Sequence, residues 1–269
     1  MKYNFICTDI DGTLLNKERQ LSTATIKEIK RIKENIPIIL ISSRMPKAMR
    51  HLQKELELDA STPLIAYNGG LILNGTNEIE STFIPNWVLS EAIQAIEKTS
   101  IHLSLYHNDH WFVPEMDYWA NRESNNTKVI PKVQKLVETL DLWAQQKKGA
   151  HKIMCMGEEN QIETLYQWLE ITFPNDISLY RSKPTYIEIA NKTISKETAI
   201  IKLLETVYPS HSLSNIVAYG DNYNDMEMLR SVGLGVAVKN AKEEVLAIAD
   251  EITERNIDDG VALSIQKYF

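Results

Sequence analysis

The chain has 269 residues, of which 43% are hydrophobic and 24% charged, and its formal net charge is −7. This composition is that of an ordinary globular protein, and it excludes a disordered or fibrous chain. The acidic balance argues against nucleic acid or an anionic membrane surface as a partner, and no apolar run approaches the roughly 20 residues that span a bilayer.

The two cysteines, Cys7 and Cys155, lie far apart in apolar contexts. This pattern fits buried small hydrophobic side chains better than a disulfide or a thiolate metal site. The N-terminal segment reaches the acidic residues Asp9 and Asp11 directly after a short apolar stretch, so no signal peptide is expected. We expect a cytoplasmic protein that is a monomer or a weak homo-oligomer.

The N-terminal part predicts alternating strands and helices. Residues 5–10 read as a short buried strand, and Ser22 can cap a helix that carries isoleucines on one face. The uninterrupted apolar run over 36–41 is typical of a strand buried in a parallel sheet. These elements form a βαβ unit, and a helix over 46–57 and a strand over 64–67 follow.

From about residue 83 the pattern changes to hairpins mixed with helices. Helices are predicted over 87–98 and 159–172, and the polar segment 116–148 is also expected to be helical. Strands are predicted over 101–107, 111–113, 151–156, 177–181 and 186–190. This mixture is typical of an α+β module inserted into another domain.

After residue 195 the parallel pattern resumes. Helices are predicted over 196–207, 225–231 and 241–249, and strands over 216–219, 235–238 and 251–253. We therefore predict an α/β fold with a doubly wound parallel sheet, a Rossmann-like core formed by residues 1–83 and 189–269. An α+β cap domain at 84–188 is predicted to interrupt it and to select the substrate.

The segment Asp9-Ile10-Asp11-Gly12-Thr13 follows the first predicted strand. Open α/β sheets bind ligands at the carboxyl ends of their strands, so both carboxylates are placed for chemistry. Asp9 could attack phosphorus, and Asp11 could protonate the leaving oxygen and then deprotonate a water. Gly12 would let backbone N–H groups approach an anion. The alternative is an Asp-Gly turn that only ends a strand.

A second acidic segment, Gly-Asp-Asn-Tyr-Asn-Asp at 220–225, follows the strand over 216–219. A carboxylate nucleophile and a phosphate repel each other unless a cation bridges them, and Mg²⁺ takes oxygen ligands from one or two carboxylates plus waters. Asp221 is placed to supply such a ligand. The alternative is helix capping, since Asn224 or Asp225 can begin the next helix, and we expect Asp225 to do so in part.

Two further groups could complete a phosphate site. Ser42, Ser43 and Arg44 follow the second predicted strand, which puts a hydroxyl and backbone amides at a strand's carboxyl end. Lys196 begins a helix, where the helix dipole disfavours a cation, so an anionic partner is expected nearby. The alternatives are two serines in an ordinary loop and a solvated surface lysine.

These residues, in this order, resemble the motifs of the haloacid dehalogenase superfamily of phosphohydrolases. The first motif matches residues 9–13, the second Ser42, the third Lys196 and the fourth residues 220–225. More narrowly, the chain resembles the Cof-like branch, whose members carry a large α+β cap of type IIB between motifs two and three. Asn68-Gly69-Gly70, Ala237 to Ala241 and Asp259 to Val261 also match this branch, although Asn-Gly alone would suit a hairpin turn.

The resemblance implies a metal site and a nucleophile. Asp9 would be the nucleophile and a metal ligand, and Asp11 the general acid/base with its backbone carbonyl on the metal. Asp221 would be the remaining carboxylate ligand of Mg²⁺, and Asp225 would support the ion through water.

The resemblance also implies the groups that hold the substrate. Ser42, Ser43, Arg44 and Lys196 would bind phosphate or substrate, and Asn224 would orient Lys196 or the substrate. Ser43 and Glu197 stand where members often have glycine. These two departures bear on how the substrate fits rather than on whether the site is active.

The predicted function is Mg²⁺-dependent hydrolysis of phosphate monoesters, either sugar phosphates or other small phosphorylated metabolites. A phosphomutase of related design would share the acidic pair, and a catalytically idle sugar-phosphate-binding regulator is the non-enzyme alternative. A receiver-type signalling domain also places Asp, Ser and Lys on a doubly wound sheet, but it is much shorter and has no use for the motif at 220–225.

Overall fold

The computed structural model describes residues 2–181 and 183–269, which form two compact units. The first unit comprises the residues up to Arg44, Met49–Glu80 and Ser195–Phe269, and the second comprises Met45–Ala48 and Ser81–Ile194. The predicted division into a catalytic core and a cap at 84–188 stays a prediction.

The first unit is built on an eight-stranded sheet with the strand order β14-β13-β12-β1-β2-β3-β4-β5. The run from β14 to β3 is parallel, and β4 is antiparallel to β3. The strands are β1 Phe5–Asp9, β2 Ile38–Ile41, β3 Pro63–Ala66, β4 Leu71–Asn74, β5 Asn77–Ser81, β12 Ile216–Gly220, β13 Leu234–Val238 and β14 Glu251–Thr253.

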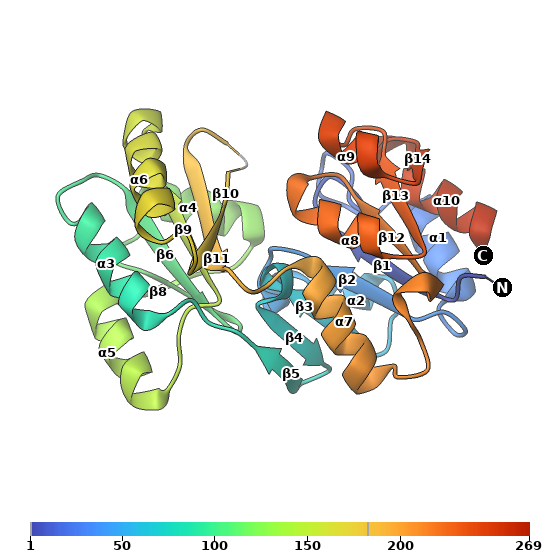
Figure 1. Ribbon diagram of the computed structural model, residues 1–269, viewed down its shortest axis with the longest axis horizontal. Helices are drawn as coiled ribbons and strands as arrows, with labels where there is room; N and C mark the ends of the chain where they lie inside the picture. Colours follow the sequence, from blue (N-terminus) through green and yellow to red (C-terminus); the bar gives the residue numbers. More distant parts are fainter. Residues whose placement is uncertain (1, 182) are drawn as a thin grey trace. The chain divides into compact units, whose positions relative to one another are not determined.

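Helices lie on both faces of this sheet (Figure 1). They are α1 Thr23–Ile32, α2 Arg50–Glu55, α7 Lys196–Val207, α8 Met226–Ser231, α9 Glu243–Ile248 and α10 Gly260–Tyr268. Alternate residues of the central strands, such as Phe5 and Cys7, pack with Ile200 and Leu203 of α7 in one hydrophobic core. Because successive side chains of a strand point to opposite faces of the sheet, the residues between Phe5 and Cys7 and their equivalents face the other side of the sheet. This architecture confirms the predicted doubly wound α/β fold.

Local chemistry explains where the first elements begin and end. The Ser22 side chain accepts a hydrogen bond from the Thr25 N–H and caps α1, as predicted. The predicted helix over 46–57 is wrong in extent: Pro46–Ala48 forms one 3₁₀ turn, and α2 starts only at Arg50. Met49, between them, has φ −117°, far from the helical value, and stands at the N-cap of α2, where its carbonyl accepts the N–H groups of Leu52 and Gln53.

The second unit holds a six-stranded sheet with the order β10-β11-β9-β6-β7-β8. Its strands are β6 His102–His107, β7 His110–Val113, β8 Lys132–Val133, β9 Lys152–Met156, β10 Ile177–Tyr180 and β11 Tyr186–Asn191, and its helices are α3 Asn86–Ile96, α4 Tyr118–Thr127, α5 Leu136–Gln146 and α6 Glu159–Thr172. Apolar side chains from the sheet and from α3, α5 and α6 share one core. The predicted α+β mixture is confirmed.

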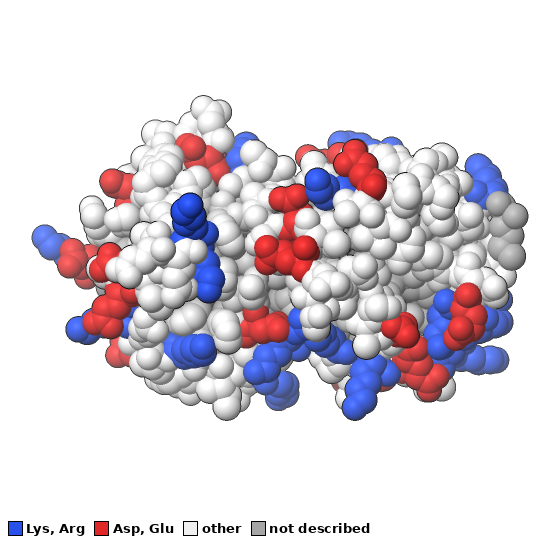
Figure 2. Space-filling view, turned by 90° about the horizontal axis from the view of Figure 1, so that it is seen from below, with Lys and Arg blue, Asp and Glu red and all other residues white. Residues whose placement is uncertain are grey.

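The surface carries charges of both signs. On the face drawn in Figure 2, acidic and basic side chains are interspersed rather than gathered into one broad basic area. Within residues 2–181 and 183–269, no helix is both long enough and apolar enough to cross a membrane.

Candidate active site

Asp9 and Lys196 meet inside the first unit, although 187 positions separate them. Asp9 is the last residue of β1 and Lys196 the first of α7, and both side chains are buried. The Lys196 Nζ donates to Asp9 Oδ1 over 2.5 Å and to Asp225 Oδ1 over 2.6 Å. The expected anionic partner of Lys196 is therefore a pair of carboxylates belonging to the protein itself.

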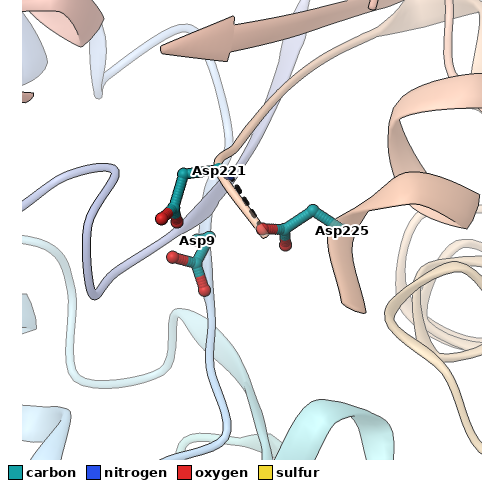
Figure 3. A group of neighbouring side chains, drawn as sticks. All are labelled: Asp9, Asp221 and Asp225. Atoms are coloured by element: carbon teal, nitrogen blue, oxygen red, sulfur yellow. Dashed lines mark hydrogen bonds between the residues drawn. The ribbon is translucent and has the colours of Figure 1, made fainter. Parts of the chain in front are cut away.

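The sheet register brings the two acidic segments together. β1 pairs in parallel with β12, with Thr8 opposite Tyr219, so the two strands end side by side. Carboxylate oxygens of Asp9, Asp221 and Asp225 lie within 4.8 Å of one another. Figure 3 shows the Asp9 and Asp221 carboxylates adjacent, with Asp225 approaching from the other side.

Asp225 uses both of its carboxylate oxygens within the protein. Oδ1 accepts from Lys196, and Oδ2 accepts the backbone N–H groups of Asp221 and Asn222, each over 3.0 Å. Asp225 stands at the N-cap of α8, which confirms the expectation that it helps to begin this helix, but its side chain makes no capping bond to α8 and folds back instead. Only glycine at position 220 leaves room for this conformation of Asp225, because a Cβ on Gly220 would lie 2.5 Å from the Asp225 Cβ.

Asp221 is held from the loop that follows β1. The Thr13 hydroxyl donates to Asp221 Oδ1 over 2.9 Å. Gly12 has φ +89°, and a Cβ on it would lie 2.4 Å from Asp221 Oδ2. Asn240, two residues after the end of β13, fixes this turn by donating its side-chain amide to the Gly12 carbonyl over 2.8 Å. Sequence reasoning gave no structural role to Thr13 or Asn240, and only the motif around each pointed to this region.

The site contains more acidic groups than basic ones. Burial raises the pKa of Asp9 well above its ordinary value, and Lys196 only partly opposes this. Burial, followed by the charge of Asp225, raises the pKa of Asp221 to about 6. Burial alone would lower the pKa of Lys196, but the charges and hydrogen bonds of Asp225 and Asp9 outweigh this effect. The net pKa of Lys196 is therefore above its ordinary value, and the ammonium stays charged. Three carboxylates thus share one cation.

A divalent cation fits this donor set. Asp9 and Asp221 offer adjacent carboxylate oxygens, which are the ligands that Mg²⁺ prefers in proteins. Two positive charges would also balance the excess of buried negative charge. Asp225 is less available as a direct ligand, because both of its oxygens already accept hydrogen bonds.

Asp11 and Arg44 form a two-pronged ion pair. Arg44 Nε donates to Asp11 Oδ2 over 2.7 Å, and Arg44 Nη2 donates to Asp11 Oδ1 over 2.6 Å. The sequence pointed to Arg44 as a substrate-binding residue, and its pairing with Asp11 was not foreseen. The predicted contact of Arg44 with substrate stays a prediction.

The remaining predicted residues lie along the same edge of the sheet. Ser42 follows β2 and is buried, and Ser43 is half-buried beside it. Asn224 donates its side-chain amide to Asn68 Oδ1 over 3.0 Å. Asn68 is also tied to Ser42, whose carbonyl accepts its N–H over 2.9 Å. The roles predicted for Ser42, Ser43 and Asn224 toward phosphate stay predictions.

Comparison with known proteins places this geometry in a family. The family model of haloacid dehalogenase-like hydrolases matches residues 6–265. A putative phosphatase of Haemophilus influenzae is 32% identical, and the match covers 100% of this chain and 99% of that protein. A 5-amino-6-(5-phospho-D-ribitylamino)uracil phosphatase of Bacillus subtilis is 27% identical, over 98% of this chain and 94% of that one.

The solved structures agree. A haloacid dehalogenase-like hydrolase from Bacteroides thetaiotaomicron superimposes with a TM-score of 0.90 at 27% identity, covering 100% of both chains. The family resemblance, the fold class and the assignment as a phosphatase that the sequence predicted are confirmed. The chain belongs to the haloacid dehalogenase-like hydrolases.

Proposed function

We propose that the protein hydrolyses small phosphate monoesters with Mg²⁺ and that Asp9 is transiently phosphorylated. The observation that carries this proposal is the buried Asp9 carboxylate at the end of β1, flanked by the Lys196 ammonium and by Asp221. A buried carboxylate between a fixed cation and a second acidic ligand is suited to accept a phosphoryl group.

In the first step, an oxygen of Asp9 forms a bond to phosphorus while the bond from phosphorus to the leaving oxygen breaks. Asp11, in its protonated form, gives its proton to that oxygen, so the product leaves as a neutral alcohol. Ser42, Ser43 and Lys196 are proposed to hold the phosphoryl oxygens during the transfer.

In the second step, Asp11, now a carboxylate, takes a proton from water. The water oxygen bonds to phosphorus and the bond from phosphorus to Asp9 breaks, which releases inorganic phosphate and restores both aspartates. Asp9 and Asp221 would hold the ion, with Asp225 in support through water. When bound, Mg²⁺ supplies the charge that lets a carboxylate approach a phosphate.

The proposed substrates are sugar phosphates and similar phosphorylated metabolites. The Bacillus relative is named for a substrate that carries its phosphate on a ribityl chain, which is a polyol monophosphate. We propose that the second unit selects among such substrates, since the first unit already supplies every group assigned to the transfer itself.

Hydrolysis of p-nitrophenyl phosphate tests this function. We expect turnover with Mg²⁺, none after chelation with EDTA, and recovery when Mg²⁺ is restored. Asp9→Asn should abolish turnover, whereas Asp141→Asn, on an exposed position of α5, should leave it unchanged. A folded wild-type protein that releases no phosphate from any of a panel of phosphorylated metabolites would rule out a phosphatase.

A further inference from the structure

The Asp11–Arg44 pair has the geometry of a rigid clamp. Two N–H groups of one planar guanidinium donate to the two oxygens of one carboxylate, over 2.7 Å and 2.6 Å. Such a fork fixes the rotation of the carboxylate as well as its position, which a single point charge cannot do. The orientation of Asp11 is therefore set by Arg44.

Arg44 is the better anchored of the two partners. Its side chain is 16% exposed, against 45% for Asp11. Its backbone N–H donates to the Ser42 hydroxyl over 3.2 Å, and its carbonyl accepts the Tyr67 N–H over 3.1 Å. Asp11, by contrast, lies on the turn after β1, next to Gly12. The clamp thus ties a residue on a turn to the end of β2.

We propose that Arg44 is the positioning residue of Asp11, and that it acts on departure of the leaving group rather than by binding the transferred phosphate. The inference rests on the general acid role given to Asp11 under the proposed function. It assigns the guanidinium to the proton-transfer geometry, whereas the sequence had pointed to substrate binding.

In this role, the effect of replacing Arg44 depends on the chemistry of the leaving group. An alkoxide is a poor leaving group and needs a well-placed proton, whereas a p-nitrophenolate leaves without one. A residue that only orients the acid should therefore matter for alkyl phosphates and hardly at all for p-nitrophenyl phosphate. A residue that binds phosphate should matter for both.

The test compares kcat/KM for p-nitrophenyl phosphate with kcat/KM for the alkyl phosphate that the wild type hydrolyses fastest, at saturating Mg²⁺. This ratio isolates the step in which the leaving group departs, because later hydrolysis of the phosphorylated Asp9 does not enter kcat/KM. Competitive inhibition by inorganic phosphate measures phosphate binding separately. The variants are Arg44→Gln, Arg44→Lys and the control Arg31→Gln, which removes an arginine of α1 that pairs with Glu28.

We expect Arg44→Gln to lower kcat/KM for the alkyl phosphate by on the order of 100-fold, the lower end of what general acid catalysis contributes. The value for p-nitrophenyl phosphate and the inhibition constant of inorganic phosphate should change by less than about threefold. Arg44→Lys should recover part of the loss, and Arg31→Gln should change none of these quantities.

Equal losses on both substrates, or several-fold weaker inhibition by inorganic phosphate, would overturn the inference and assign Arg44 to phosphate binding. Should Arg44→Gln not fold by circular dichroism, Arg44→Lys carries the same comparison. Asp11→Asn distinguishes a failure of the positioning role of Arg44 from a failure of the general acid role of Asp11. If Asp11→Asn shows the leaving-group-dependent loss and the Arg44 variants do not, only the inference fails; if Asp11→Asn lacks it, the proposed role of Asp11 fails first.

Discussion

Lys196 illustrates how single residues define this site. Its ammonium is buried at the start of a helix, a place where neither burial nor the helix dipole favours a cation. The hydrogen bonds to Asp9 and Asp225 offset both penalties. Removing either carboxylate would leave an incompletely paired buried charge, which costs several kcal/mol in other proteins.

Gly12 offers a test at the scale of one atom. Gly12→Ala places a Cβ 2.4 Å from Asp221 Oδ2 at a backbone φ of +89°, so Asp221 must move. We expect kcat for p-nitrophenyl phosphate to fall at least about tenfold, since transition-state contacts depend on ångström-scale placement. The Mg²⁺ concentration for half-maximal activity should rise.

The control for this change is Gly75→Ala. Gly75 has φ +62°, and a Cβ there would lie 3.2 Å from the Ala60 carbonyl oxygen and 3.3 Å from the Ser61 Cα, both far along the chain from the acidic residues of the site. Both variants carry a backbone cost of roughly 1 to 2 kcal/mol, but only one disturbs Asp221. Equal effects of the two variants on the Mg²⁺ dependence would contradict the assigned role of Gly12.

The site residues at the ends of strands could be predicted from the sequence, but the hydrogen bonds and ion pairs that hold their side chains could not. The convergence of Asp9 with Asp221 follows from placing two apolar strands side by side in a parallel sheet. The Arg44–Asp11 clamp and the Thr13–Asp221 hydrogen bond join loops of different βα units. Their existence depends on loop conformations that carry no periodic signal in the sequence.

At the scale of elements, most apolar strands were predictable and weakly patterned ones were not. β2 is apolar and buried throughout, which made it visible in the sequence. β5, Asn77–Ser81, has one apolar residue in five and is only partly buried, so no alternation marks it. Weak patterning explains the missed β5 only: β4, Leu71–Asn74, was missed although it is apolar and mostly buried, and so was the C-terminal α10, which buries Val261, Ala262 and Ile265.

The second unit contains a histidine that is buried in its neutral form. His151, just before β9, is 0% exposed, its Nδ1 accepts the Asn108 N–H over 3.3 Å, and its Nε2 shares a hydrogen bond with Ser81. Burial, together with the nearby His107, lowers the pKa of His151 to about 3. Protonation would place an N–H at Nδ1 against the N–H of Asn108.

This arrangement predicts a loss of stability in acid. Because the folded pKa lies below the unfolded value of about 6.5, the unfolded state binds more protons, and stability falls as the pH drops from about 6.5 toward 3. At pH 5 the loss from His151 amounts to about 2 kcal/mol. His107 and His102 have pKa values shifted in the same direction and add to the total slope.

Urea unfolding followed by tryptophan fluorescence measures this effect, since all five tryptophans lie between Ser81 and Ile194. His151→Gln should be less stable than the wild type near neutral pH, yet should lose about 2 kcal/mol less on going to about pH 5. Parallel losses in the two proteins would show that His151 is not the group responsible.

In the intact protein, the stability of each unit can be followed by a different measurement. The proposed metal ligands, Asp9 and Asp221, lie in the first unit, which contains no tryptophan among its described residues. Amide exchange of β1 and β12 therefore reports the unit that binds the metal, and tryptophan fluorescence reports the other. Each unit can be followed in the intact chain.

Mg²⁺ should stabilise the first unit by mass action. At about 100 times its Kd the ion is expected to raise the free energy of local opening at β1 and β12 by up to about 2.7 kcal/mol. Asp221→Asn should abolish this effect. Without metal the same variant is expected to be more stable than the wild type near neutral pH, because burial and the charge of Asp225 raise the pKa of Asp221 to about 6 and so disfavour its carboxylate in the fold.

Magnesium protection that persists in Asp221→Asn would place the ion elsewhere. A metal-free variant less stable than the metal-free wild type would instead show that the Thr13–Asp221 hydrogen bond outweighs the cost of burying the carboxylate near Asp225. Glu80→Gln is the control: it removes a half-buried carboxylate of β5 that pairs with Lys202, and it should leave the Mg²⁺ effect intact.

The central claim is that Asp9 carries the phosphoryl group during turnover. The direct measurement is to quench the wild-type protein with acid during hydrolysis of p-nitrophenyl phosphate, reduce it with borohydride, and map the peptide that contains Asp9 by mass spectrometry. Borohydride converts an aspartyl phosphate to homoserine, so the account predicts homoserine at position 9 and none in Asp9→Asn. Unmodified Asp9 in an actively turning-over protein, together with residual activity of Asp9→Asn, would contradict it.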